Sequence, residues 1–227
     1  MLRVATLLVV LTTTLGAQSG TPAPAPGPRF AVAYVEVMSS ARNALIAAVS
    51  AYREASRREE GYERIELFAQ PERPGHFVII ETWRDPQAFA AHGMAPHVRQ
   101  FRDSLEAIRV SGYDERPYRA LSVAPPPAAV PSQAIHLVAH VDIGGQQANV
   151  PGMLTQLAEE SRKERGALRV DVLQNTVRQN HFTVVETWAS RAAHEAHAAA
   201  PHTKRYRDTL QPISGSPLDE RIVQSIP

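Results

Sequence analysis

The chain reads HFVIIETW at residues 76–83 and HFTVVETW at residues 181–188. The two stretches lie 105 residues apart, and the same offset relates APH at 95–97 to APH at 200–202 and DER at 114–116 to DER at 219–221. About 25 of the 64 positions from 54 to 117 are identical in the second copy, far more than chance gives. The chain is therefore a tandem duplication of one domain.

Each copy has the same order of expected elements. Alternating residues predict strands at 32–37 and 138–143, and apolar residues at helical spacing predict a helix after each. Hairpins are predicted from 62–69 and 76–83, across a turn at 71–75, and from 167–174 and 181–188. A second helix then begins near Pro86 and restarts after Pro96, and short strands at 116–123 and 220–226 end the copies. This order is that of the ferredoxin-like βαββαβ unit, an α+β fold.

The second strand of each hairpin is apolar on both faces. In the first copy Phe77 and Ile79 alternate with Val78 and Ile80. Helices cover only one face of a ferredoxin-like sheet, so the other face needs its own cover. We expect the two copies to pack sheet to sheet as an internal pseudo-dimer, and further oligomerisation stays open.

Prolines divide the chain into segments. They cluster at 22–28 and again at 125–131, where polyproline-like backbone interrupts helices and central strands. The expected division is a signal peptide (1–17), a Pro-rich spacer (18–29), a first domain (30–123), a Pro-rich linker (124–134) and a second domain (135–227).

The N-terminal segment has the anatomy of a secretory signal peptide. Arg3 precedes an apolar run at 4–11, which continues weakly to 15, and small residues Gly16 and Ala17 follow. The apolar run is shorter than the roughly 20 residues that a membrane-spanning helix needs. We expect cleavage near Ala17 and an exported, periplasmic or secreted protein with no membrane span after cleavage; a retained anchor is the alternative.

Charge and cysteine content exclude several classes of protein. Lys and Arg total 24 against 23 Asp and Glu, for a formal net charge of +1, and removal of Arg3 with the signal peptide would leave none. No nucleic-acid partner is expected from such a balance. Because the chain has no cysteine, disulfides, cysteine-ligated zinc, iron–sulfur clusters and thiol nucleophiles are excluded.

A series of short motifs in both copies resembles one known family. GYER at 61–64 or GALR at 166–169, then Phe-x-x-x-Glu-x-Trp, then a histidine ahead of Pro-His, is similar to the antibiotic biosynthesis monooxygenase (ABM) domain of the dimeric α+β barrel superfamily. The resemblance covers nearly all of both folded regions. It implies an intramolecular dimeric α+β barrel with a pocket in each half between sheet and helices. Family members include cofactor-independent oxygenases of anthrones and quinols and haem-degrading enzymes, so the reaction has to come from the site.

The candidate catalytic residues are histidines of the second helical region. Imidazole is the natural base near neutral pH, tryptophan offers an aromatic wall, and arginine can hold a phenolate or a reduced-oxygen anion. The catalytic candidates are His92, His97, His197 and His202; the substrate-binding candidates are Trp83, Trp188, Tyr34, His140, Arg102 and Arg207. Trp83 equally fits a hydrophobic core, and His97, next to Pro96, equally fits a helix cap.

Other cofactor chemistries find little support. Haem-degrading relatives place an Asn on the first strand, a Trp where His92 and His197 stand and a His near Arg102 and Arg207, and neither copy has any of the three. His194 and His197 do not form the zinc-protease motif, and no nucleotide-binding loop is present. We expect no bound cofactor and no metal.

Glu81 and Glu186 stand in otherwise apolar strands. A carboxylate there should find a partner, and Arg64 or Arg169 is the expected one, or it should titrate abnormally.

The leading interpretation is an exported monooxygenase-like protein that binds a small aromatic or quinol-type molecule and oxidises it with dioxygen, without a bound cofactor. The alternative is a non-catalytic small-ligand-binding or stress-response module, and haem binding or degradation is a third, weaker one.

Overall fold

The computed structural model describes residues 26–145, 147 and 149–227. The predicted signal peptide and most of the spacer lie outside these residues. The first copy consists of β1 (Arg29–Glu36), α1 (Arg42–Ser56), β2 (Tyr62–Gln70), β3 (Arg73–Trp83), α2 (Pro86–Gly93), α3 (Pro96–Glu106) and β4 (Asp114–Ser122). The second consists of β5 (Ile135–Asp142), α4 (Val150–Ser161), β6 (Ala167–Asn175), β7 (His181–Trp188), α5 (Arg191–Ala199), α6 (Pro201–Leu210) and β8 (Asp219–Ile226). The βαββαβ order is confirmed in both copies.

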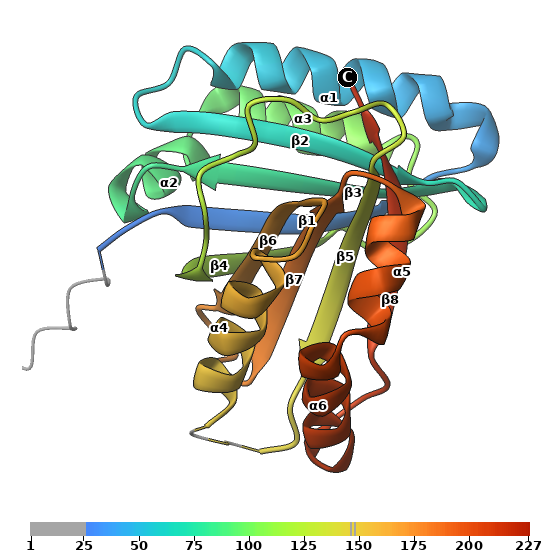
Figure 1. Ribbon diagram of the computed structural model, residues 1–227. Helices are drawn as coiled ribbons and strands as arrows, with labels where there is room; N and C mark the ends of the chain where they lie inside the picture. The colour runs from blue at the N-terminus through green and yellow to red at the C-terminus, as the bar shows by residue number, and fades with distance from the viewer. Residues whose placement is uncertain (1–25, 146, 148) are drawn as a thin grey trace, which may run out of the picture.

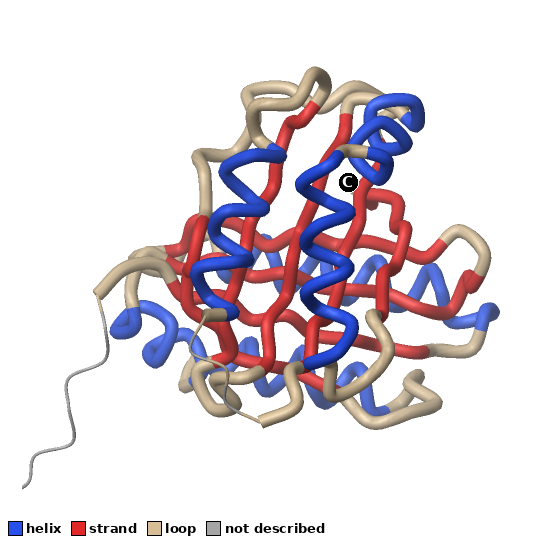
Figure 2. Tube along the Cα trace, turned by 60° about the horizontal axis from the view of Figure 1, so that its bottom comes forward, coloured by secondary structure: helices blue, strands red, loops and turns tan. Residues whose placement is uncertain are grey.

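The eight strands close into one barrel in the order β1-β3-β2-β8-β5-β7-β6-β4. The seams join the copies: β4 pairs with β6, with Tyr118 opposite Asn175, and β2 pairs with β8, with Leu67 opposite Ile226. Figure 1 shows the first copy's strands crossing those of the second, with each copy's helices on the outside. In Figure 2 the strands lie between two helical layers. The expected pseudo-dimer within one chain is thus confirmed.

Strand alternation divides the core into three parts. Residues of both copies, among them Phe30, Val78, Val138 and Val185, fill the barrel interior. The residues between them in sequence, such as Ile79, face the helices of their own copy. Each large apolar side chain buried in this way stabilises the fold by roughly 1.5–3 kcal/mol, so the apolar faces of β3 and β7 account for the sheet-to-sheet packing.

The hairpin of the first copy is tighter than predicted. Gln70 pairs directly with Arg73, so β3 begins inside the stretch 71–75 that was expected to be a turn.

Two glycines bring the turn after the first helix against the second helix. Gly61 and Gly166 have φ of +79° and +90°, and a Cβ on either would lie 2.4 Å from Ala88 Cβ or 2.7 Å from Ala193 Cβ. Only glycine fits such a backbone and such a close approach without strain. The approach carries the residue two positions earlier, Glu59 or Glu164, towards the histidines of the next helix.

Among the described residues no helix is long and apolar enough to span a membrane.

Candidate functional site

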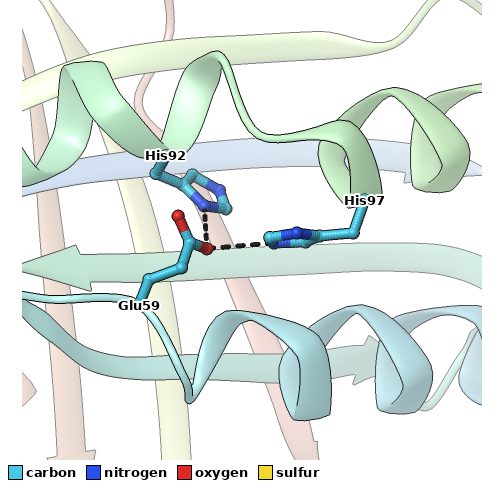
Figure 3. A group of neighbouring side chains, drawn as sticks. All are labelled: Glu59, His92 and His97. Atoms are coloured by element: carbon cyan, nitrogen blue, oxygen red, sulfur yellow. Dashed lines mark hydrogen bonds and ion pairs between the residues drawn. The ribbon is translucent and has the colours of Figure 1, made fainter.

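In the first copy two of the predicted histidines meet on one carboxylate. Glu59 Oε1 lies 2.7 Å from His92 Nδ1 and 2.9 Å from His97 Nε2. Figure 3 shows His92 and His97 pointing from successive helices towards Glu59, which follows α1. Asp85 caps the helix that carries His92 by accepting the Ala88 amide at 2.8 Å, and Pro96 begins the helix that carries His97.

His92 is buried between an indole and a second carboxylate. Its ring stacks on Trp83 with centroids 4.1 Å apart, and its Nε2 lies 2.6 Å from the Tyr52 hydroxyl and 3.3 Å from Glu81 Oε2. Tyr52 donates to Glu81 Oε1 at 2.8 Å, and Trp83 Nε1 donates to Glu81 Oε2 at 3.2 Å. Because the Tyr52 proton goes to Glu81, the Tyr52 oxygen accepts from His92. Glu59, His92, Tyr52 and Glu81 form one continuous hydrogen-bonded chain.

This environment favours the protonated form of His92. Burial lowers the pKa of His92, but the hydrogen bonds and charges of Glu81 and then of Glu59 outweigh it and raise the pKa above its ordinary value. Burial, reinforced by the charge of Glu81, raises the pKa of Tyr52 far above its usual range. Tyr52 therefore keeps its proton near neutral pH, and the protonated form of His92 is favoured relative to a free imidazole.

The second copy keeps the glutamate and both histidines. Glu164 Oε1 lies 2.7 Å from His197 Nδ1 and 2.9 Å from His202 Nε2, and His197 stacks on Trp188 at 4.5 Å. Trp188 Nε1 donates to Glu186 Oε2 at 2.7 Å. These contacts are present in both copies although the surrounding residues differ. They are therefore a feature of the repeated domain.

The surroundings of His197 differ from those of His92. Leu157 stands where the first copy has Tyr52, so no hydroxyl bridges His197 to Glu186, and the distance from His197 Nε2 to Glu186 Oε1 is 3.9 Å. That distance is beyond hydrogen-bonding range. The Nε2 side of His197 is therefore free of the relay that holds His92.

Two cavities lie along α6 in the second copy. One, of about 190 Å³, is lined by His202, Leu157 and Tyr206 among others. The other, of about 550 Å³, is lined by Arg207, Leu210, Leu218 and the turn that follows α6. The first copy has larger aromatic rings, Tyr52 and Tyr113, where the second has Leu157 and Leu218.

The predicted arginines lie on the same helices as His97 and His202 and are paired. Arg102 Nη2 donates to Glu115 at 2.9 Å, and Arg207 Nη2 donates to Glu220 at 3.3 Å. Arg207 lines the cavity of about 550 Å³.

Tyr34 and His140 do not join the histidine sites. Both alternate with residues of the helix side and so point into the barrel, where Tyr34 packs beside Val32 and His140 lies close to Arg116. The structure thus brings together His92, His97 and Trp83, and likewise His197, His202 and Trp188, but leaves these two residues on the other face of the sheet.

The expected partners of Glu81 were wrong. Arg64 and Arg169 both bind Glu66, and Arg169 also binds Asp171, on the barrel side of the sheet. Glu81 faces the helices and is held by Tyr52 and Trp83 instead. The alternation of side chains along a strand places these arginines and this glutamate on opposite faces.

The sequence analysis missed Glu59, Glu164 and Tyr52 as members of the site. Glu59 and Glu164 match at the repeat offset, and that identity within a charged turn was the available signal. Tyr52 gave no such signal, because its counterpart is Leu157.

The two Glu-His-His groups contain donor atoms of the kind that bind divalent ions, within 4.8 Å of one another in each group. In both copies, however, the carboxylate already accepts a hydrogen bond from a histidine ring nitrogen, at 2.7 Å. This arrangement orients the imidazoles through a shared acceptor.

A family model described as antibiotic biosynthesis monooxygenase matches residues 28–104 and again residues 143–209. The chain belongs to this family and carries its domain twice. None of the proteins with curated descriptions matches the chain.

Several solved structures have the same fold over most of their length. A candidate monooxygenase from Fusobacterium nucleatum is 16% identical, with a TM-score of 0.74 over 88% of this chain and 93% of that one. A candidate monooxygenase from Lactobacillus acidophilus is 16% identical, with a TM-score of 0.69 over 88% and 94%. An anthrone oxidase-like protein is 12% identical, with a TM-score of 0.70 over 88% and 92%. At these identities the likeness is one of fold.

Proposed function

We propose that the protein is an exported monooxygenase that binds a small aromatic or quinol-type molecule in its second copy and oxidises it with dioxygen without a bound cofactor. The observation that carries the proposal is that His202 and Arg207 line cavities in the copy whose His197 is free of the tyrosine relay. Membership of the monooxygenase family supports the reaction class.

In this proposal His197 is the general base. Its ring lies 5.9 Å from that of the cavity-lining His202, and substrate binding has to open a path to its buried Nε2. Glu164 holds His197 Nδ1 at 2.7 Å and so orients the ring, which leaves Nε2 to accept a proton. An activated methylene between aromatic rings would give this proton to Nε2. The resulting carbanion passes one electron to dioxygen, the radical pair combines to a peroxide, and loss of water leaves a carbonyl group. In sum, one CH₂ group and one O₂ become one C=O group and one H₂O.

Arg207 has the second role. A guanidinium beside a partly apolar cavity favours the anionic form of a bound phenol or enol, which lowers the cost of removing its proton. Arg207 is already paired with Glu220 at 3.3 Å, so substrate binding would draw it away from a partly exposed ion pair. Such a pair stabilises the fold by only about 0–1 kcal/mol.

The first copy is proposed to be a structural partner without turnover. Tyr52 closes the Nε2 side of His92, and the raised pKa of His92 disfavours the neutral imidazole that a general base requires.

Oxygen uptake with a panel of anthrones and hydroquinones tests the proposal. His197→Ala is expected to abolish uptake, whereas His92→Ala, its matched control in the other copy, should keep uptake at the wild-type rate after correction for folded protein. Uptake that survives His197→Ala excludes the proposed base. If no member of the panel is consumed but ligands still shift the melting temperature, the protein is a binding module.

Export is tested separately. Expression of the full chain with its own N-terminus should yield a protein outside the cytoplasm whose sequence begins near Gln18. A protein that keeps residues 1–17 in the cytoplasm would contradict export without affecting the oxidation assay.

A further inference from the structure

A second cluster of histidine and carboxylate side chains lies at one end of the barrel, on the face of the sheet opposite the helices. His140 and Asp142 end β5 and His181 begins β7. Asp142 Oδ1 lies 2.7 Å from His140 Nε2 and 2.6 Å from His181 Nδ1. The three side chains are mostly buried, with exposures of 11%, 23% and 18% in the order His140, Asp142, His181.

The contacts in this cluster are not hydrogen bonds. Asp142 Oδ1 is buried and has no hydrogen-bond partner, although two ring nitrogens are within 2.7 Å of it. In the Glu59 and Glu164 groups, by contrast, the carboxylate accepts a well-directed hydrogen bond from a ring nitrogen. A bound cation would satisfy a buried carboxylate oxygen that has two ring nitrogens beside it and no hydrogen-bond partner.

We propose that His140, Asp142 and His181 bind one divalent transition-metal ion of the Zn²⁺ class per chain. Two imidazoles and one carboxylate form a ligand set that such ions prefer. For metal–ligand bonds of about 2.0 Å in tetrahedral geometry the three atoms have to move apart by roughly 0.5 Å, which small side-chain rotations allow.

The neighbourhood supports this site. The other oxygen of Asp142, Oδ2, accepts the Ser216 hydroxyl at 3.1 Å, which orients the carboxylate. A cavity of about 470 Å³ lined by all three residues leaves room for water in a fourth position.

One resident cation competes for the site. Arg116 Nη1 lies 2.7 Å from His140 Nε2, while its Nε and Nη2 bind Asp114. The guanidinium therefore partly neutralises the cluster when no metal is bound. Metal binding has to displace only Nη1 from His140, and the pair with Asp114 can persist. The nearby Asp219 and Arg221 of β8 are paired with each other at 2.6 Å.

The first copy offers an internal control. At the matching positions it has Tyr34, Glu36 and His76, so one imidazole is replaced by a phenol. Glu36 Oε1 lies 3.1 Å from His76 Nε2, and no second imidazole joins them. A metal-to-chain ratio of one therefore distinguishes this site from the Glu-His-His groups, which occur in both copies.

Titration of the chelator-treated full chain with Zn²⁺, followed by calorimetry, tests the site, and the visible absorption of Co²⁺ reports its ligands. We expect one ion per chain. His181→Ala should weaken binding by more than the roughly 10–100-fold that loss of a mere supporting group costs, and His76→Ala should leave binding unchanged. Arg116→Gln should tighten binding, because it removes the competing cation.

Several results would overturn the site. One is the absence of saturable Zn²⁺ binding. Another is a stoichiometry of two ions per chain that does not change in His181→Ala. A third is a loss of affinity in His76→Ala equal to that in His181→Ala. If His181→Ala lowers the melting temperature, Asp142→Asn provides the second test, and unchanged affinity in a folded Asp142→Asn protein also overturns the proposal. Because the site lies on the barrel side of the sheet, its failure leaves the oxidation proposed for His197 untouched.

Discussion

The two copies share a scaffold and differ in what fills it. Both hold two histidines on one glutamate beneath a buried tryptophan. In the first copy Tyr52 completes a hydrogen-bonded chain from Glu59 to Glu81; in the second Leu157 interrupts it and cavities lie nearby. On the barrel side it is the second copy that has the additional polar group, because it has the imidazole of His140 where the first copy has Tyr34.

This comparison shows what duplication permits. In each copy the Glu-His-His group joins the turn after the first helix to the two short helices that follow. The positions around it differ between the copies. One copy has an extra hydrogen-bonded tyrosine and the other has cavities, and the barrel joins both in a single molecule.

The largest expected effect concerns a feature that the copies share. Trp83→Ala and Trp188→Ala each remove a fully buried indole and should lower the free energy of unfolding by about 3–5 kcal/mol. Denaturant unfolding of each variant measures the loss. A loss below about 1 kcal/mol in either variant would show that the two tryptophans are not equivalent core residues.

The turns after the first helices come next. Gly61→Ala should cost about 2–3 kcal/mol, because it adds a Cβ at positive φ, 2.4 Å from Ala88 Cβ. Gly166→Ala should cost less, since the corresponding distance is 2.7 Å. Gly152→Ala is the matched control: it lies in α4 with nothing within 4 Å of its Cβ and should stabilise the protein by up to about 1 kcal/mol. Equal effects at all three positions would contradict the close approach.

Tyr52→Phe sharpens the contrast between the histidine sites. It removes the hydroxyl that joins His92 to Glu81 and leaves buried polar groups without a partner, at a cost of about 1–2 kcal/mol. Tyr206→Phe removes a tyrosine hydroxyl from the second copy and serves as the control. It should lower the free energy of unfolding by less than Tyr52→Phe does. Thermal and denaturant unfolding measure both; a larger loss in Tyr206→Phe would contradict the relay.

The smallest effect is a pH dependence. The pKa of His92 is raised in the folded protein above its ordinary value of about 6.5, so the folded state holds this proton more tightly than the unfolded chain. Its contribution to stability is therefore complete below about pH 6.5 and is lost as the pH rises through the folded pKa. His92→Gln should flatten the fall in stability above pH 6.5. A slope that His92→Gln leaves unchanged would mean that the proton is held elsewhere.

The fold was largely predictable from the sequence. The constant offset between the repeats indicated two copies of one domain. Because the strand at 76–83 is apolar on both faces, a second sheet was expected to cover the face that the helices leave open. The meeting of His92 with His97 also follows from the sequence, because the two residues flank the restart of a helix at Pro96.

Contacts that depend on how the chain folds back were not predictable in the same way. Glu59 reaches the histidines only because the turn ending at Gly61 packs against α2. The partner of Glu81 was misjudged because Arg64 lies next to the residue opposite Glu81 in the hairpin. Its side chain, however, points to the other face of the sheet. Tyr34 and His140 were substrate-binding candidates on strands that could face the pocket or the barrel, and strand alternation directs them to the barrel side.

The barrel seams have a consequence for misfolding. Tandem copies of one sequence are prone to pair strands with the wrong copy during folding, and a sheet with free edges recruits strands from other molecules. Here β4–β6 and β2–β8 are pairings between copies in the native state itself. The pairing that is an error in most repeat proteins is thus the one that closes this fold, and the stretch from Ser122 to Ile135 is the covalent link that lets it close within one chain.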